Sequence, residues 1–291
     1  IHSGLMARLT WDGENSDISL LGIVYPFKVF TPTESRTVQV LNRINGLAAD
    51  RFGNVRSLVQ GSGEFQGLID RYWGDTYWNG GPWFLSTMWY GLHYAERADF
   101  TPGKADINVL KSKLDLLFPH LGRVGLGAEQ IAPSNSLLYP GQPDFRLQAA
   151  WPNAWESMST YVDSLMAFLD MTPDAPNNIL RLAPKLPTGW STLTYKNVRL
   201  GASRLDIKVT ETGRETTVEF TNLSGGPLQT STWLRLPTGA VPTGVVTVNG
   251  AKTTYQYDGT ANRVRVQTPI ATGTGAKTTI RVLGKAAISP P

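Results

Sequence analysis

The sequence contains no cysteine and only three histidines among its 291 residues. Without cysteine there are no disulfides and no thiolate metal sites, so redox chemistry gives no indication of the compartment. The histidines, His2, His93 and His120, are scattered along the chain, which argues against a histidine metal cluster. We therefore expect neither a metal nor a cofactor.

Long apolar runs and dense positive charge are missing as well. No segment reaches the roughly 18 uninterrupted apolar residues of a membrane helix, and the longest apolar stretch is broken by His93, Glu96 and Arg97. The formal net charge is only +4, and no cluster of lysines or arginines is dense enough to follow a phosphate backbone. We expect neither a membrane nor a nucleic acid as a partner.

What the sequence does contain is an ordinary globular composition, with 41% hydrophobic and 17% charged residues. It is long enough for one large domain or two. Apolar residues at helical spacing predict helices at about 37–49, 82–98, 105–118 and 153–170. On the last helix, the residues expected to face inward are Trp155, Met158, Val162, Leu165 and Leu169.

The pattern changes after a proline-rich linker at 172–178, and beyond about Gly189 it has period two. Short alternating segments and the Asn249-Gly250 turn predict a β-sandwich. We expect this part to brace the helical part. Sugar binding is the less favoured alternative, because this part contains only two tryptophans, Trp190 and Trp233, to cover a sugar ring.

The most unusual stretch is 71–85, where a cation, a carboxylate and six aromatic rings surround a turn-rich loop. Aromatic faces cover the apolar side of a sugar ring, while arginine and aspartate bond to its hydroxyls. The alternative is an aromatic seam between core helices. Residue types alone do not choose between them.

The run Arg-Tyr-x-x-Asp-Thr-Tyr-x-x-Gly-x-Pro-Trp-Phe-Leu in this stretch resembles glycoside hydrolase family 15, the glucoamylases and glucodextranases. A second segment, 17–27, resembles the Asp-x-Ser-Leu-Leu-Gly-x-x-Tyr-Pro-Phe run of bacterial members. By residue type alone it is a buried apolar connector that ends at Pro26. The two matches occur in the family's order.

The resemblance implies a catalytic residue and a set of sugar-binding residues. Glu129, in Gly-Leu-Gly-Ala-Glu-Gln, matches the general base that deprotonates water in an inverting hydrolysis. Without the resemblance, Glu129 is equally a loop residue paired with Arg123 or Arg146. The residues implied to bind substrate are Arg71, Tyr72, Asp75, Trp83 and Trp151, with Asp75 fixing the guanidinium of Arg71 in a bidentate contact.

The match departs from the family after Trp151, where Pro152-Asn153 replaces the usual Ser-Tyr or Ser-His. The residues that give the base its hydrogen-bond support in the family are therefore absent here, and Asn153 and Glu156 are the candidates to replace them.

The resemblance covers only the second half of an (α/α)6 helical toroid, because twelve helices need at least about 200 residues. We therefore expect an α+β multidomain chain, with the second half of a toroid at 1–175 and a β-sandwich at 176–291. The family's general acid, in a Trp-Glu motif, has no match; Trp11-Asp12 is the nearest candidate. Since the sequence opens with Ile1, we expect that an upstream segment was removed and that a separate N-terminal polypeptide supplies the acid and completes the toroid.

The resulting prediction is the C-terminal chain of an exo-acting α-glucoside hydrolase that acts on an oligo- or polysaccharide in the periplasm or outside the cell. One alternative is a related enzyme of the same structural clan, such as a trehalase, a phosphorylase or a lyase on another hexoside. The other is a carbohydrate-binding remnant without catalysis.

Overall fold

The computed structural model of the chain describes residues 16–49, 53–75, 81–122, 125–132, 138–139, 142–146, 151–236 and 240–286. Contacts within the chain divide it into two compact units. We call residues 1–97 with 109–165 the helical unit, and residues 98–108 with 166–291 the sheet unit. This division falls earlier than the boundary expected between residues 175 and 176.

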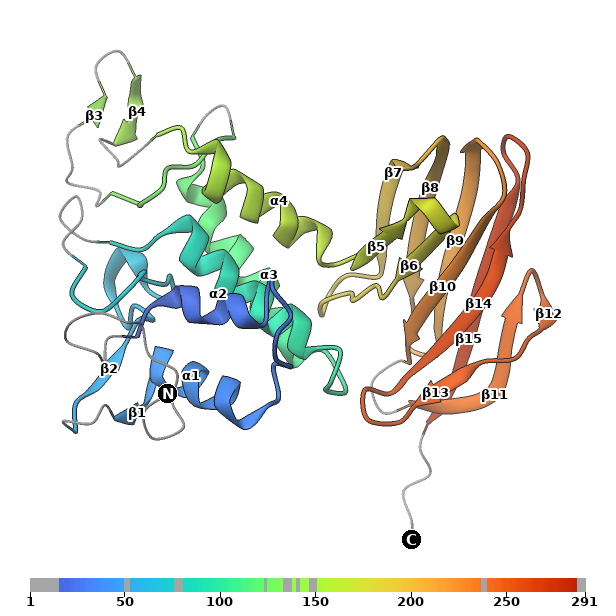
Figure 1. Ribbon diagram of the computed structural model, residues 1–291, viewed down its shortest axis with the longest axis horizontal. Helices are drawn as coiled ribbons and strands as arrows, with labels where there is room; N and C mark the ends of the chain where they lie inside the picture. Colours follow the sequence, from blue (N-terminus) through green and yellow to red (C-terminus); the bar gives the residue numbers. More distant parts are fainter. Residues whose placement is uncertain are drawn as a thin grey trace, which may run out of the picture. The chain divides into compact units, whose positions relative to one another are not determined.

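The helical unit combines helices with two short hairpins (Figure 1). Its described elements are η1 (Ile18–Ile23), α1 (Ser35–Ile44), β1 (Asn45–Ala49), β2 (Val55–Ser57), η2 (Gly63–Phe65), α2 (Phe84–Arg97), most of α3 (Ala105–Leu117), η4 (Phe118–His120), β3 (Leu138–Tyr139), β4 (Gln142–Arg146), the π-helical turn η5 (Ala154–Met158) and α4 (Ser159–Met166). Together with the strands of the sheet unit, this is a mixed helix-and-sheet chain, as the α+β class predicts.

The helix expected at 37–49 is shorter than predicted. α1 ends at Ile44, and the chain continues as strand β1, which pairs antiparallel with β2. The cause is Gly46, whose φ of +67° is a left-handed conformation that glycine adopts without strain. A Cβ there would also lie 3.1 Å from the Cβ of Ser57 on the partner strand. The prediction of helix beyond residue 44 is wrong.

The helices expected at 82–98 and 105–118 are confirmed as α2 and α3. Phe84 and Met88 of α2 are buried, as are Ile107 and Leu110 of α3, and each pair follows the apolar spacing of its helix. The two helices approach closely, since a Cβ on Gly91 would lie 2.9 Å from Cδ1 of Leu110. Helical periodicity therefore identified both core faces.

The segment predicted at 153–170 is helical only to Met166, and the prediction of its inner face is partly wrong. Trp155 is 81% exposed, Val162 54% and Leu165 42%. Leu169 is buried as predicted, but within the helical part, from Ala154 to Met166, the buried residues are small and hydroxylated: Ser157, Thr160 and Ser164. The segment therefore turns its hydroxyl side toward the described chain and its apolar side away from it.

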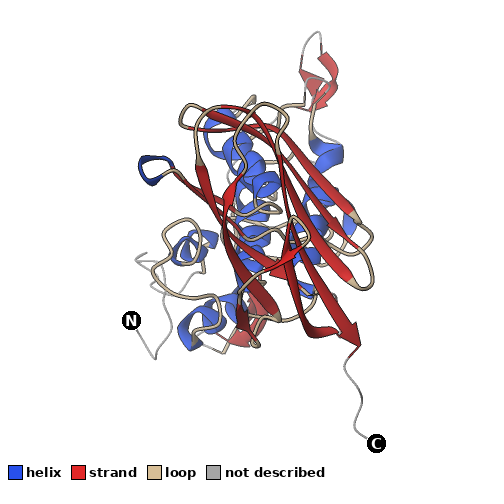
Figure 2. Cartoon of the chain, turned by 90° about the vertical axis from the view of Figure 1, so that its right-hand side faces the viewer, coloured by secondary structure: helices blue, strands red, loops and turns tan. Residues whose placement is uncertain are grey.

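The sheet unit contains a five-stranded and a six-stranded sheet, whose strands are drawn in red in Figure 2. The five-stranded order is β13-β14-β10-β6-β5, and the six-stranded order is β12-β11-β15-β9-β8-β7. The bounds are β5 (Met171–Asp174), β6 (Ile179–Leu182), β7 (Thr192–Leu200), β8 (Ser203–Glu211), β9 (Glu215–Ser224), β10 (Leu228–Arg235), β11 (Ala240–Val248), β12 (Ala251–Lys252), β13 (Gln256–Asp258), β14 (Arg263–Ile270) and β15 (Lys277–Ala286), with η6 at Ala175–Asn177.

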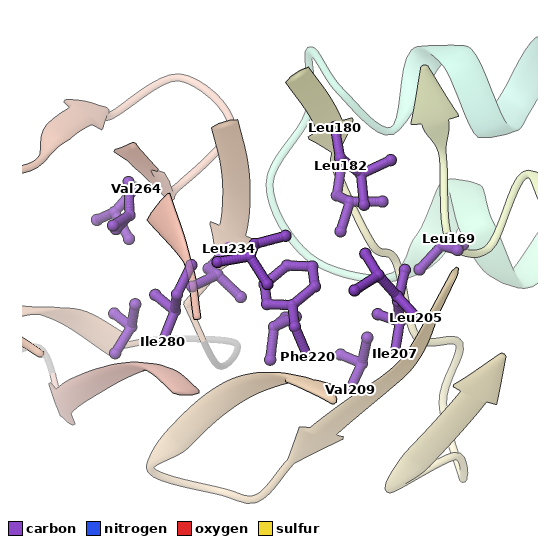
Figure 3. Close-up of a cluster of buried hydrophobic side chains, with 14 of the residues drawn as sticks. Leu169, Leu180, Leu182, Leu205, Ile207, Val209, Phe220, Leu234, Val264 and Ile280 are labelled. Carbon is purple, nitrogen blue, oxygen red and sulfur yellow. The ribbon is translucent and has the colours of Figure 1, made fainter. Parts of the chain in front are cut away.

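One apolar core joins the inner faces of the two sheets (Figure 3). Leu205, Ile207 and Val209 of β8 are buried and alternate with more exposed residues, as the period of two predicts. They share the core with Leu234 and Val264 of the other sheet. The β-sandwich arrangement is thereby confirmed at the level of two stacked sheets.

The predicted Asn249-Gly250 turn is confirmed between β11 and β12. Both residues have positive φ, +50° and +83°. That combination defines the type I′ hairpin turn, whose twist matches the strands.

A buried ion cluster lies in the sheet unit. Lys185, 2% exposed, has its Nζ 2.5 Å from Asp170 Oδ2 and 3.0 Å from Asp99 Oδ2. Arg263 Nη1 lies 2.8 Å from Asp99 Oδ1. Burial opposes the charge of Lys185, but the two aspartates outweigh it and hold the pKa of Lys185 above its usual value. The ammonium group is therefore a fixed charge at physiological pH.

Candidate functional site

The cation and the aromatic ring expected to contact a sugar lie against each other in the helical unit. The guanidinium carbon of Arg71 is 4.8 Å from the centroid of the Trp83 ring. Trp83 is 2% exposed, and its Nε1 donates to Asp75 Oδ2 at 2.8 Å. A ring held at its edge by a carboxylate and covered on one face by a cation has a fixed orientation. The expected bidentate contact of Asp75 with Arg71 stays a prediction.

The segment that carries Glu129 is fastened to the start of α2. The N–H of Phe84 donates to the carbonyl oxygen of Glu129 at 3.3 Å, and the N–H of Ile131 donates to that of Pro82 at 2.8 Å. Gly127 permits this approach, since a Cβ there would lie 2.8 Å from Cζ of the Phe84 ring. The backbone of Glu129 is thus held beside the residue that follows Trp83.

The start of η5 is bound to the same segment. The N–H of Asn153 donates to the carbonyl oxygen of Gly127 at 3.0 Å, and Ser157 Oγ donates to that of Ala128 at 2.7 Å. Asn153 Oδ1 accepts from the N–H groups of Glu156 and Ser157, each at 3.1 Å, and so caps the first turn. These bonds fix residues 127–129 against residues 153–157.

Glu129 and Glu156 meet at this junction, and their carboxyl groups share a hydrogen bond. Burial, this bond and the charge of Glu129 raise the pKa of Glu156 from its ordinary 4.5 to about 7, although the Arg71 guanidinium acts in the opposite direction. Two carboxyl groups in direct contact cannot both ionise without a large cost. Glu156 therefore keeps its proton up to about pH 7.

The two segments that carry the family resemblance lie side by side. The N–H of Ile18 donates to the carbonyl oxygen of Arg71 at 2.8 Å, and Asp17 pairs with Tyr72 in an antiparallel β-bridge. Asp17 also caps η1 by accepting from the N–H of Ser19. The connector at 17–27 therefore supports the backbone of the aromatic stretch.

Trp151 is half-buried and precedes a cis peptide bond to Pro152. Asn153, two residues after Trp151, bonds to Gly127, and this brings the chain at Trp151 close to the segment that carries Glu129. Both residues named as candidate support have a place here: Asn153 anchors the backbone, and Glu156 bonds to the carboxyl group of Glu129. A contact between Trp151 and substrate stays a prediction.

Several sequence predictions lie outside the described residues. These are Tyr77, Trp78, the Asn79-Gly80 part of the turn, Arg123 and Trp11-Asp12, while Arg146 is described only in its backbone.

Sequence reasoning named Glu156 as one of two candidates to support Glu129, but it did not predict that the two carboxyl groups meet. A signal for it exists, because Asn153-x-x-Glu156 has the spacing of a helix capping box. In such a box the glutamate bonds back to its own helix start. Here the asparagine caps the turn, and the glutamate side chain reaches Glu129 instead, which only the fold reveals.

No helix in the described part of the chain is long and apolar enough to cross a membrane. Within the same residues, no cluster of three or more His, Cys, Asp or Glu side chains is arranged to hold a metal ion.

Comparison with known proteins relates one part of the sheet unit to carbohydrate enzymes. Residues 174–231, from the end of β5 into β10, match the family model described as "Glycosyl hydrolase family 65, C-terminal domain". No curated protein matches. Among solved structures, the chain is similar to the alpha-L-rhamnosidase from Dictyoglumus thermophilum, with 10% identity and a TM-score of 0.31. That alignment covers 47% of this chain and only 15% of the rhamnosidase.

The matched segment is therefore related to the C-terminal domain of a glycoside hydrolase. It lies wholly in the sheet unit, whereas Glu129, Glu156 and Arg71 lie in the helical unit.

Proposed function

We propose that this chain carries the water-activating part of an inverting, exo-acting α-glucoside hydrolase of the glucoamylase or glucodextranase type. Glu129 is the general base, Arg71, Tyr72, Asp75 and Trp151 contact the sugar, and the buried ring of Trp83 holds Arg71 in place. The observation that carries the proposal is the convergence of Glu129 with a second carboxyl group, next to the stacked Arg71 and Trp83. The family 65 match in the sheet unit supports a carbohydrate-active enzyme at that coarser level.

In this mechanism Glu129 takes a proton from the water that attacks the anomeric carbon, so Glu129 must be ionised and correctly oriented. Glu156 meets both needs. Below about pH 7 it is the protonated partner, and its O–H donates to the carboxylate of Glu129. Glu156 thus keeps its proton below about pH 7 and acts as a positioning residue for Glu129.

Glu156 is not the general acid for the same bond. Two catalytic carboxyl groups lie about 6.5–9.5 Å apart in inverting glycosidases and about 5–5.5 Å apart in retaining ones, because the sugar and the water fit between them. Carboxyl groups that share a hydrogen bond leave no such room. We propose that the acid comes from a separate N-terminal polypeptide.

The apolar side of η5 and α4 supports such a partner. Trp155 and Val162, seven residues apart, share one helical face and are 81% and 54% exposed, while Ser157, Thr160 and Ser164 are buried. A helix with its polar side inward and its apolar side outward is unfavourable unless another element covers it. We propose that the N-terminal polypeptide covers this face and completes an (α/α)6 toroid with the helical unit. A secreted or periplasmic location suits this activity on a polysaccharide.

The test has two parts. Denaturing mass spectrometry of the purified protein asks whether a second polypeptide accompanies the chain. Turnover of maltooligosaccharides and isomaltooligosaccharides is then compared between the wild type and Glu129→Gln. We expect a loss of at least about two orders of magnitude in turnover with substrate binding retained.

Glu64→Gln is the matched control, because Glu64 is an exposed glutamate of η2 in the same unit. Unchanged turnover in Glu129→Gln removes Glu129 from the catalytic site. Sugar binding without any turnover, in a sample that contains the second polypeptide, favours the carbohydrate-binding remnant instead.

A further inference from the structure

A small pocket lies in the sheet unit where an edge strand leaves its sheet. β13 pairs with β14 only from Gln256 to Asp258. Just before β13, the N–H of Thr253 donates to the carbonyl oxygen of Val246, on β11 of the other sheet. The chain thus crosses from one sheet to the other, and a pocket of about 210 Å³ lies beside the crossing.

The pocket is polar and has one cation. Its lining residues are Thr254, Tyr255, Gln256, Arg265 and Gln267. Two amides and two hydroxyl groups each offer a donor and an acceptor, and Arg265 adds donors only. None of the described residues that line the pocket is acidic. An anion would use the donors and leave every acceptor without a role, whereas a sugar hydroxyl uses both kinds of group.

Arg265 is held in place but keeps bonding capacity. Its Nε donates to Ser231 Oγ at 2.8 Å, and its guanidinium carbon lies 6.0 Å from the centroid of the Trp233 ring. Its neighbour Arg263 is bound by two carboxylates, Asp99 at 2.8 Å and Asp258 at 3.1 Å. No carboxylate forms an ion pair with Arg265 within the described part of the chain. A fixed guanidinium with spare N–H groups is well suited to two neighbouring hydroxyls.

We propose that this pocket binds one neutral sugar unit of a saccharide, with Arg265 and the amides of Gln256 and Gln267 bonding to its hydroxyls. The pocket volume of about 210 Å³ is below the roughly 300–1,000 Å³ of pockets for drug-sized ligands, which agrees with a ligand as small as one sugar unit. Tyr255 packs on the core between the sheets and so gives the pocket a rigid wall. The proposal does not depend on catalysis by Glu129.

Isothermal titration calorimetry of the full protein with maltoheptaose and isomaltoheptaose tests the pocket. The variants carry Glu129→Gln as a common background, so that no substrate is consumed. We expect Arg265→Ala to weaken binding about tenfold or more, because it removes charge-assisted hydrogen bonds. Arg199→Ala, an exposed arginine of β7 on the other sheet, is the matched control and leaves binding unchanged.

Gln267→Ala provides a second variant at an exposed position, so a folding defect in Arg265→Ala does not decide the result. Binding that neither variant weakens overturns the proposal, as does the absence of binding by both saccharides. Inorganic phosphate that competes with the saccharide for Arg265 overturns the neutral-sugar assignment. A protein that hydrolyses saccharides yet shows no effect of Arg265 keeps the proposed function and loses the pocket.

Discussion

Each unit of the chain brings two acidic side chains close together, and the two units neutralise them in different ways. In the sheet unit, Lys185 lies between Asp99 and Asp170 and supplies a permanent positive charge. In the helical unit, Glu156 bonds to Glu129, and burial together with this neighbour raises the pKa of Glu156 to about 7. A lysine-bridged pair stays in one charge state over the physiological range, while a proton-sharing pair changes charge near pH 7.

That difference separates a structural cluster from a candidate functional one. Perturbed carboxyl groups that titrate near neutral pH are typical of acid–base sites. Ion pairs that are buried with their counter-charge also shift pKa values, but they stabilise one conformation. The predictions below test this comparison, from the largest effect on stability to the smallest.

We expect the largest loss of stability when the buried aspartates of the sheet unit lose their cation, Lys185. Lys185→Met leaves two acidic groups in a buried site without their central cation, which costs about 3–5 kcal/mol of unfolding free energy. Chemical denaturation measures the loss. Lys277→Met is the control, because Lys277 is 58% exposed in its pair with Glu219 and its removal costs about 1 kcal/mol or less. Equal effects of the two variants would show that the cluster is not structural.

The geometry of the carboxyl pair depends on the close packing of Gly127 against the ring of Phe84. Gly127→Ala places a Cβ 2.8 Å from the Phe84 ring, so either the ring or the 127–129 segment must move. Overpacking of this kind costs about 1–3 kcal/mol, and we expect activity to fall with it because Glu129 shifts. Gly61→Ala, with nothing within 4 Å of its Cβ, is the control and stays within about 0.5 kcal/mol of the wild type. A stable but inactive Gly127→Ala protein would localise the effect to the pair.

The carboxyl pair also predicts a pH dependence of stability. The folded-state pKa of Glu156, about 7, lies above its ordinary value of 4.5, so the folded protein binds more protons between these pH values. The stability from protonated Glu156 is complete below pH 4.5 and is lost as the pH rises through 7. Thermal unfolding should show a larger fall in Tm from pH 5.5 to pH 8 in the wild type than in Glu156→Gln, whose amide donates at every pH. An identical fall in both proteins contradicts the raised pKa.

Local patterns in the sequence predicted much of this architecture. Helical spacing identified the buried faces of α2 and α3, and alternation identified the sandwich strands such as β8. These features depend on neighbours a few residues away, so the sequence contains them directly. The end of α1 was missed because Gly46 follows the helix without a break in the apolar pattern.

The failures at α4 and at the candidate site have another cause. Apolar spacing on 153–170 shows that one face needs a partner, but not whether that partner lies in the same chain. Glu156 meets Glu129 through hydrogen bonds between residues 26 and 29 positions apart, from the N–H of Asn153 to Gly127 and from the Oγ of Ser157 to Ala128. Such long-range contacts leave no periodic trace, and the motif resemblance identified Glu129 but left the choice between Asn153 and Glu156 as its support open.

The most direct test of the proton-sharing pair is a pH titration of the glutamate side-chain carboxyl carbons by ¹³C NMR. We predict one glutamate with a midpoint near 7 in the wild type. That signal should be absent in Glu156→Gln and shifted to lower pH in Glu129→Gln, where burial still acts but the neighbouring charge is gone. If every glutamate titrates near its ordinary value of 4.5 in the wild type, then Glu129 and Glu156 do not share a proton, and the helical unit holds no poised carboxyl pair.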